Sequence, residues 1–249
     1  MRRGRALLLT GLLWVGVPGA CARAQASATP PCPQPEHLVL RDLSLPAARA
    51  DLARDGRLVI LTIGGAATAG AAAGDPAAAY PARLQVELEA ALPGKAVTVL
   101  NKATARRDVA PMAKYLSDTI HATGARLVIW ATGAREAARS ADIDDYVAGL
   151  VKGIASIRAA GADVILLDMQ FAPSIAGIIN FAPYRDALRG TAEAYAVPLL
   201  RRYDLMQQWS DDGVMNLDAR DDAERRMVAR KLFACIAAAL APPIAQAVR

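Results

Sequence analysis

Short apolar runs alternate with longer amphipathic stretches from about residue 57 onward. The runs are nearly continuous and often β-branched, which is typical of parallel strands covered on both faces. They lie at residues 58–63, 97–100, 127–130, 164–167 and 197–200. The amphipathic stretches lie at residues 81–92, 110–123, 143–160, 184–196 and 223–240. This alternation predicts an α/β fold, with a five-stranded parallel sheet inside a three-layer α/β/α sandwich.

Ligands bind beyond the carboxyl ends of the strands in open parallel sheets. The segments that follow the predicted strands are therefore candidate parts of a functional site, together with the segment before the last helix. These segments are residues 64–70, 101–107, 131–136, 168–173 and 210–222.

Particular residue patterns occur in these segments. A glycine pair and Ala66 follow the first strand, and Asn101, Lys102 and Ala103 follow the second. The third strand leads into Thr132-Gly133-Ala134-Arg135-Glu136, and the fourth into Asp168-Met169-Gln170. Asp212-Gly213-Val214-Met215 precedes the last helix. In this order, over residues 58–240, the patterns resemble the SGNH (GDSL-type) hydrolases, in an exported bacterial branch with altered catalytic blocks.

The resemblance implies a flavodoxin-like fold and a relation to esterases, lipases, acyl-hydrolases and carbohydrate deacetylases. It also implies that four functional positions are altered. Ala66 stands in place of the nucleophilic serine, and Ala103 in place of a glycine whose amide binds the oxyanion. Arg135 replaces the oxyanion-binding asparagine, and Met215 replaces the histidine base.

Acyl transfer needs a hydroxyl nucleophile, a base and donors aimed at the oxyanion. Beyond the leader, the histidines are His37, before the sheet, and His121, near the amino end of the third strand. Thr68 is the hydroxyl residue of the first site loop, and we interpret it as a cap of the following helix. We therefore predict a catalytically inactive protein with a ligand-binding or accessory role; the alternative is an active esterase, acyl-hydrolase or deacetylase that uses non-standard residues.

Ten residues at the carboxyl edge of the sheet are candidates to line a pocket. They are Gly64, Gly65, Thr68, Asn101, Gly133, Arg135, Glu136, Asp168, Gln170 and Asp212. Arg135 is expected either to pair with Glu136 or Asp168 and plug the pocket, or to receive an anionic or carbohydrate ligand. The partners expected from the resemblance are an acyl-ester or carbohydrate ligand, or an envelope protein.

We expect no cofactor and no metal. The glycines at residues 64–70 do not match a dinucleotide fingerprint, and no phosphate-loop lysine follows them. Two scattered histidines form no metal cluster. The acidic residues within 211–222 leave calcium binding as a less favoured alternative to a solvated loop.

The N-terminus has the pattern of a cleaved secretory signal peptide. Three arginines precede an apolar stretch at residues 6–20, and Ala24 and Ala26 are the small residues of a cleavage site. We predict cleavage after Ala26 and export to the periplasm or medium; a lipoprotein that begins at Cys21 is the alternative. The predicted organisation is a signal peptide (1–26), an arm with a short helix (27–56) and one domain (57–249), without a later segment that could span a membrane.

Removal of the leader changes the charge and the cysteine count. The net charge of +5 falls to +1, because the leader holds four arginines and no acid, and this leaves no argument for nucleic-acid binding. Cys32 and Cys235 then remain as a pair in a chain addressed to an oxidising compartment. A disulfide between them is predicted, and a free buried thiol at Cys235 is the alternative.

Overall fold

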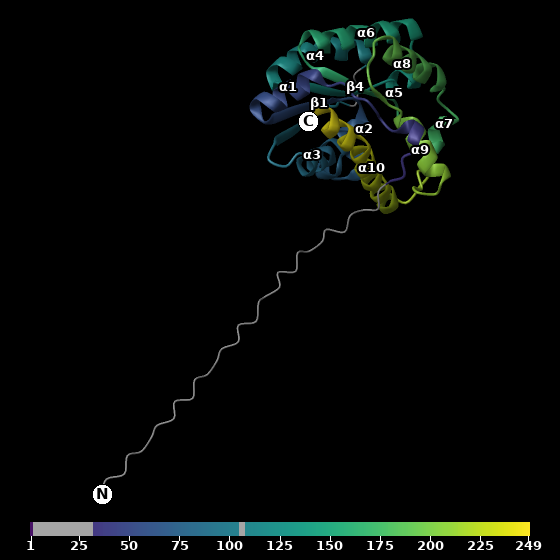
Figure 1. Cartoon of the computed structure of the whole chain (residues 1–249). Coiled ribbons are helices and arrows are strands. Elements are labelled where there is room, and N and C mark those ends of the chain that lie inside the picture. The colour runs from purple at the N-terminus through teal and green to yellow at the C-terminus, as the bar shows by residue number, and fades with distance from the viewer. Residues whose placement is uncertain (2–31, 105–107) are drawn as a thin grey trace. The chain divides into compact units, whose positions relative to one another are not determined.

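A computed structural model (Figure 1) describes residues 1, 32–104 and 108–249, apart from the side chains of Ala110, Ala113 and Lys114. The predicted signal peptide and its cleavage site lie outside the described residues. Residues 31–249 form one compact unit.

Five parallel strands form a single sheet in the order β2-β1-β3-β4-β5. The strands are β1 (Arg57–Ile63), β2 (Ala96–Asn101), β3 (Leu127–Ala131), β4 (Asp163–Leu167) and β5 (Leu199–Leu200). The predicted sheet is confirmed, and the strand order is that of flavodoxin-like folds. The direction of winding reverses between β1 and β3, where Leu61 pairs with Val128.

Helices cover both faces of the sheet. They are α1 (Pro46–Asp55), α3 (Tyr80–Ala91) and α10 (Asp222–Val248) on one face, and α4 (Val109–Thr123), α6 (Ile143–Ala159) and α8 (Ala182–Ala194) on the other. Figure 1 shows α4, α6 and α8 on one side of the strands, with α3 and α10 on the opposite side. Neighbouring strand residues point to opposite faces, so Leu58 and Ile60 join the first core while Val59 and Leu61 join the second. The three-layer sandwich is confirmed.

Short elements fill the connections at the carboxyl edge and in the N-terminal arm. They are η1 (Glu36–Leu38), α2 (Ala66–Ala69), η2 (Ala71–Ala73), η3 (Pro76–Ala78), α5 (Ala134–Ala138), α7 (Pro173–Ala176) and α9 (Arg202–Asp211).

Two elements differ in length from the sequence prediction. Strand β5 has two residues, because the amide of Val197 donates to the carbonyl of Ala192 and closes α8 instead of joining the sheet. Helix α10 continues past Leu240 and through Pro242 and Pro243. Its added turns bury Ile244, Ala245 and Val248 in the core, and this burial favours helix despite the hydrogen bonds that the prolines remove.

Because of this extension, α10 is long and apolar enough to cross a membrane by length and composition, contrary to the sequence prediction. Such helices are weak evidence for a membrane span, since core helices meet the same criteria. In this fold α10 packs against α1, α3 and η2, and 61% of its most apolar window is buried inside the protein.

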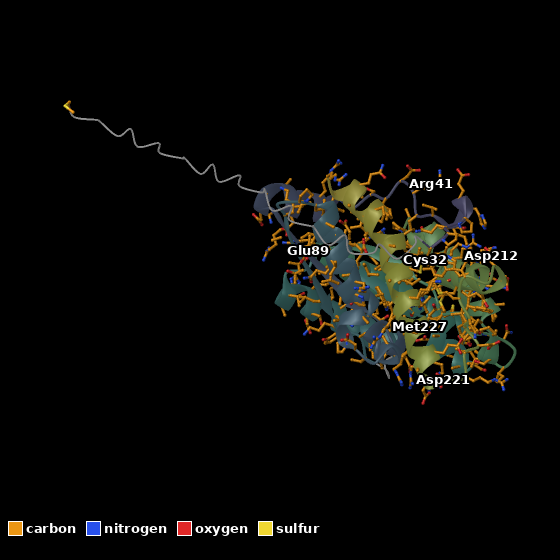
Figure 2. All side chains as sticks on the ribbon, turned by 90° about the horizontal axis from the view of Figure 1, so that it is seen from below. Cys32, Arg41, Glu89, Asp212, Asp221 and Met227 are labelled. Atoms are coloured by element: carbon orange, nitrogen blue, oxygen red, sulfur yellow. A yellow bond between two sulfur atoms is a disulfide. The ribbon has the colours of Figure 1, made fainter. Side chains whose placement is uncertain are left out.

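The predicted disulfide between Cys32 and Cys235 is present, with 5.5 Å between the two Cα atoms. Figure 2 looks onto α10 and shows Cys32 beside this helix, with Asp221 at the beginning of the helix. The Trp209 indole nitrogen donates to the carbonyl of Pro33 at 2.6 Å. The arm is therefore attached to α10 and α9 at neighbouring points of the chain.

Candidate functional site

A cavity of about 330 Å³ opens at the carboxyl edge of the sheet, between the loops that follow β1 and β3. Its walls come from the turn after β1, the start of α5, one residue of α4 and one residue after β5. The lining residues are Gly65, Ala66, Ala67, Thr68, Met112, Ala131, Thr132, Gly133, Ala134, Arg135, Glu136, Ala138 and Arg202. The cavity lies where the winding of the sheet reverses, which is the usual place for ligands in such folds.

The first wall is a single helical turn, α2, that begins at Ala66. Ala66 is exposed, whereas Thr68 is fully buried. A Cβ on Gly64 would come within 2.4 Å of the Thr68 hydroxyl, so only glycine fits there. Thr68 lies inside α2 and its hydroxyl forms no hydrogen bond with the described residues. The interpretation of Thr68 as a helix cap is therefore wrong.

Asn101 connects the end of β2 to this turn. Its side-chain amide nitrogen donates to the carbonyl of Thr68 at 3.0 Å, and its oxygen accepts from the amide of Ala103 at 3.1 Å. The Ala103 amide, which the resemblance assigns to the oxyanion hole, thus already has a partner. Asn101 and Ala103 hold the loop together, and neither residue lines the cavity.

Arg135 stands at the rim of the cavity and pairs with Asp108, at the start of α4. Arg139 pairs with the same carboxylate at 2.6 Å. Glu136 is buried and accepts a hydrogen bond of 2.6 Å from the amide of Val109. The expected pairing of Arg135 with Glu136 or Asp168 is wrong. The Glu136 carboxylate accepts from the first amide of α4, and the Asp168 carboxylate accepts from an amide just after β5.

The segment before α10 does not reach the cavity. Met215 is buried in the core that contains α10. Asp212 is exposed, accepts from Gln208 at 2.9 Å and lies at the outer edge of the view in Figure 2. Both lie outside the set of residues that line the cavity, so the prediction that Asp212 belongs to this pocket is wrong.

Asp168 and Arg202 meet beneath the cavity. The Asp168 carboxylate accepts from the amide of Tyr203 at 2.8 Å, and Arg202 donates to the Asp168 carbonyl at 2.5 Å. Burial raises the pKa of Asp168 to about 7, although the Tyr203 amide and the Arg202 charge oppose this shift. Burial also lowers the pKa of Arg202.

Two phenols stand behind the threonines that line the cavity. Tyr80 faces Thr68, and Tyr146 faces Thr132. Neither pair forms a hydrogen bond of good geometry, and all four oxygens are buried. Burial raises the pKa of Tyr80 to about 12 and also raises that of Tyr146. Both phenols are therefore neutral at ordinary pH.

The model of the non-GDSL lipase-like family matches residues 31–249. The chain belongs to this family. The match covers the whole compact unit, including the arm and α1. No curated protein matches the chain at a significant level.

Several solved structures share the fold of this non-GDSL lipase-like protein. TesA is 19% identical, with a TM-score of 0.56, over 72% of this chain and 97% of TesA. A catalytic mutant of the acetylxylan esterase Axe2 from Geobacillus stearothermophilus is 16% identical, with a TM-score of 0.55, over 71% and 92% of the two chains. The SGNH-hydrolase family esterase AlinE4 is 18% identical, with a TM-score of 0.52, over 66% and 86%. The predicted resemblance to SGNH hydrolases is confirmed.

The structure brings together only some of the predicted pocket residues of this non-GDSL lipase-like protein. Gly65, Thr68, Gly133, Arg135 and Glu136 line the cavity. Gln170 instead lines a separate groove of about 470 Å³ between the loop after β4 and the start of α10. No group of three described His, Cys, Asp or Glu side chains is arranged to hold a metal ion.

Arg202 is the main residue of the site that the sequence analysis did not include. It lies two residues after the end of β5, so the rule that singled out the ends of the other strands applies to it as well. Asp108 also went unnoticed, because its pairing with Arg135 joins two helices that lie 27 residues apart.

Proposed function

We propose that this protein is an exported, catalytically inactive member of the non-GDSL lipase-like family that acts by binding a ligand. The carrying observation is the alanine at position 66. It is exposed at the cavity where a nucleophile would stand, and none of the residues that line this cavity is serine, cysteine or histidine.

The structure also supports the absence of a base. Met215, which the resemblance puts in the place of the histidine, is packed in the core and does not line the cavity. His121 lies in the last turn of α4, which leads into the amino end of β3 and thus the opposite edge of the sheet. Thr68 and Thr132 remain as lining hydroxyls, and an unassisted hydroxyl is a weak nucleophile.

The donors for an oxyanion are altered in the same way. The amide of Ala103 is bound to Asn101, and the guanidinium of Arg135 is bound to Asp108. Neither group is pre-aimed at a reacting carbonyl, which is the condition for transition-state stabilisation. Loss of nucleophile, base and donors together supports binding without turnover.

Esterase activity of the purified protein tests this proposal. We expect wild-type protein to match buffer on p-nitrophenyl acetate, p-nitrophenyl butyrate and acetylated xylooligosaccharides. Ala66→Ser is also expected to be inactive, because loss of the base alone costs on the order of 10⁴ to 10⁶ in rate in a working triad.

Two arginine variants separate real turnover from a contaminant. Arg135→Ala changes the rim of the cavity, and Arg220→Ala changes an exposed arginine outside it. Hydrolysis that is well above background, falls in Arg135→Ala and persists in Arg220→Ala would show an active esterase and overturn the proposal.

A further inference from the structure

Arg202 is a buried cation that lines the cavity. Its side chain belongs to a residue that is 3% exposed. One terminal nitrogen donates to the carbonyl of Asp168, and Nε has no hydrogen-bond partner among the described residues. In contrast, Arg135 and Arg185 form ion pairs with Asp108 and Asp204. Within the described chain, Arg202 forms no ion pair.

A buried guanidinium without a directly paired anion is unfavourable, because burial removes its hydration. The carboxyl group that interacts electrostatically with Arg202, that of Asp168, accepts from the Tyr203 amide and is only partly ionised near neutral pH, since burial raises its pKa to about 7. The phenol of Tyr80, which also interacts electrostatically with Arg202, is neutral. The Arg202 guanidinium can therefore bind a further anion, and the cavity that it lines provides space for one.

Two threonines line the same cavity from opposite sides of the switch point. Thr68 comes from the turn after β1 and Thr132 from the end of β3, and both line the cavity. Thr68 is 0% exposed and Thr132 is 5% exposed, and their hydroxyls face the phenols of Tyr80 and Tyr146 without a hydrogen bond of good geometry among the described residues. Buried polar groups that lack a good hydrogen bond destabilise a fold, so the Arg202 Nε and these two hydroxyls, all from residues that line one cavity, favour a polar ligand.

The remaining walls are mostly apolar. Met112 and the alanines at positions 66, 67, 131, 134 and 138 supply them, while the charged lining residues Arg135 and Glu136 are bound to Asp108 and to the Val109 amide. A ligand that matches both kinds of wall has one compact anionic end and a short aliphatic body. Arginine suits a carboxylate in particular, because its planar group donates two parallel hydrogen bonds.

We propose that this cavity binds a short-chain aliphatic carboxylate, with Arg202 as its counter-ion and the hydroxyls of Thr68 and Thr132 as further donors. This inference rests on the proposed function, since it gives the ligand class of a site that does not hydrolyse esters. The protein would then recognise the acid that an ester hydrolase releases.

Titration calorimetry with butyrate, butyramide and methyl butyrate tests the inference. At about pH 6 butyrate is ionised, because ordinary carboxyl groups titrate near 4. We expect butyrate to bind at least tenfold more tightly than the two neutral analogues. Equal affinities for butyrate and butyramide, or no binding of butyrate at millimolar concentration, would overturn the inference.

Two pairs of variants locate the binding site. Arg202→Met is expected to weaken butyrate binding at least tenfold, whereas Arg158→Met should leave it unchanged. Arg158 also donates to a backbone carbonyl, that of Tyr195, but lies on the exposed surface. Unchanged affinity in Arg202→Met would contradict the proposal.

Thr132→Val provides an independent measurement if Arg202→Met does not fold. It is expected to weaken butyrate binding several-fold while the free protein remains at least as stable as wild type, because the variant removes a buried hydroxyl that lacks a good hydrogen bond. Thr191→Val is the matched control, since Thr191 is equally buried and donates to Ala187 at 2.8 Å. Thr191→Val should be less stable than wild type and should keep its affinity for butyrate. If Thr191→Val weakens butyrate binding while Thr132→Val weakens only stability, the inference is overturned.

The ester assay and the binding assay can fail separately. Protein that binds butyrate and also hydrolyses butyrate esters overturns the proposed function alone. Protein that does neither leaves catalytic silence intact and overturns the carboxylate site.

Discussion

Asp168 shows at the residue scale how the buried polar groups under the cavity depend on one another. Its carboxyl group is held by the amide of Tyr203, and it faces the charges of Arg202, Arg185 and Asp204 from α8 and from the start of α9. Burial outweighs the attraction of the two arginines and raises its pKa to about 7. Such a shift makes the stability of the fold depend on pH.

The unfolded chain releases the Asp168 proton near pH 3.9, whereas the folded protein holds it to about pH 7. Within this window the folded state binds more protons, so a rise in pH favours unfolding. We predict that, between pH 3.9 and pH 7, the free energy of unfolding of wild type falls relative to that of Asp168→Asn, by about 1.4 kcal/mol per unit of pKa difference. Above pH 7 the difference between the two proteins should be constant. Urea unfolding at a series of pH values measures it.

Asp186→Asn is the control for this experiment, because the Asp186 side chain is 72% exposed. It should follow the wild-type pH dependence. A free-energy difference between wild type and Asp168→Asn that does not change with pH would contradict the raised pKa.

At the scale of elements, α10 lines the groove that contains Gln170 and is bonded to the N-terminal arm. It covers the sheet together with α3, and its buried Cys235 bonds to Cys32 of the arm. Residues 36–55 add Leu38, Leu45 and Leu52 to the same core. The arm and α1 are thus packed parts of the sandwich.

The disulfide closes a loop of 203 residues. In the chain-entropy model a loop of this size contributes up to roughly 5 kcal/mol, and strain reduces that contribution. We predict that reduction of the disulfide shifts the unfolding midpoint of wild type to a lower urea concentration. Cys32→Ala should unfold at this same lower concentration with or without reductant. Free labelling of both thiols in the folded, oxidised protein would contradict the bond.

At the scale of the whole molecule, the family match and the compact unit cover the same residues, 31–249. The part of the chain before them carries the predicted leader. Without this leader the charge is close to neutral, and the disulfide suits an oxidising compartment. These observations support the proposal of export.

Export predicts a particular N-terminus. After expression in a bacterial host, the protein recovered from the periplasm should begin at Ser27, because signal peptidase selects small residues such as Ala24 and Ala26. Intact-mass analysis measures this directly. A mature chain that begins at a lipid-modified Cys21, or unprocessed protein in the cytoplasm, would contradict it.

The pattern of apolar residues was sufficient to predict the sheet, the helices on its two faces and the loops in which a site would form. This information is local, because side-chain periodicity follows from the geometry of each strand or helix. The altered positions Ala66 and Met215, on which the proposal of inactivity rests, were also inferred from the sequence, through the family resemblance. The cysteine pair could be predicted because only two candidates remained after the leader.

The composition of the cavity was decided by tertiary structure. Arg202 and Thr68 lie 134 positions apart along the chain and meet only because β5 and β1 end at the same edge of the sheet. The partner of Arg135 became Asp108, and Asp212 was placed outside the cavity. Such contacts depend on how loops from distant strands converge. The charge balance of the site therefore follows from the fold and cannot be obtained from local patterns.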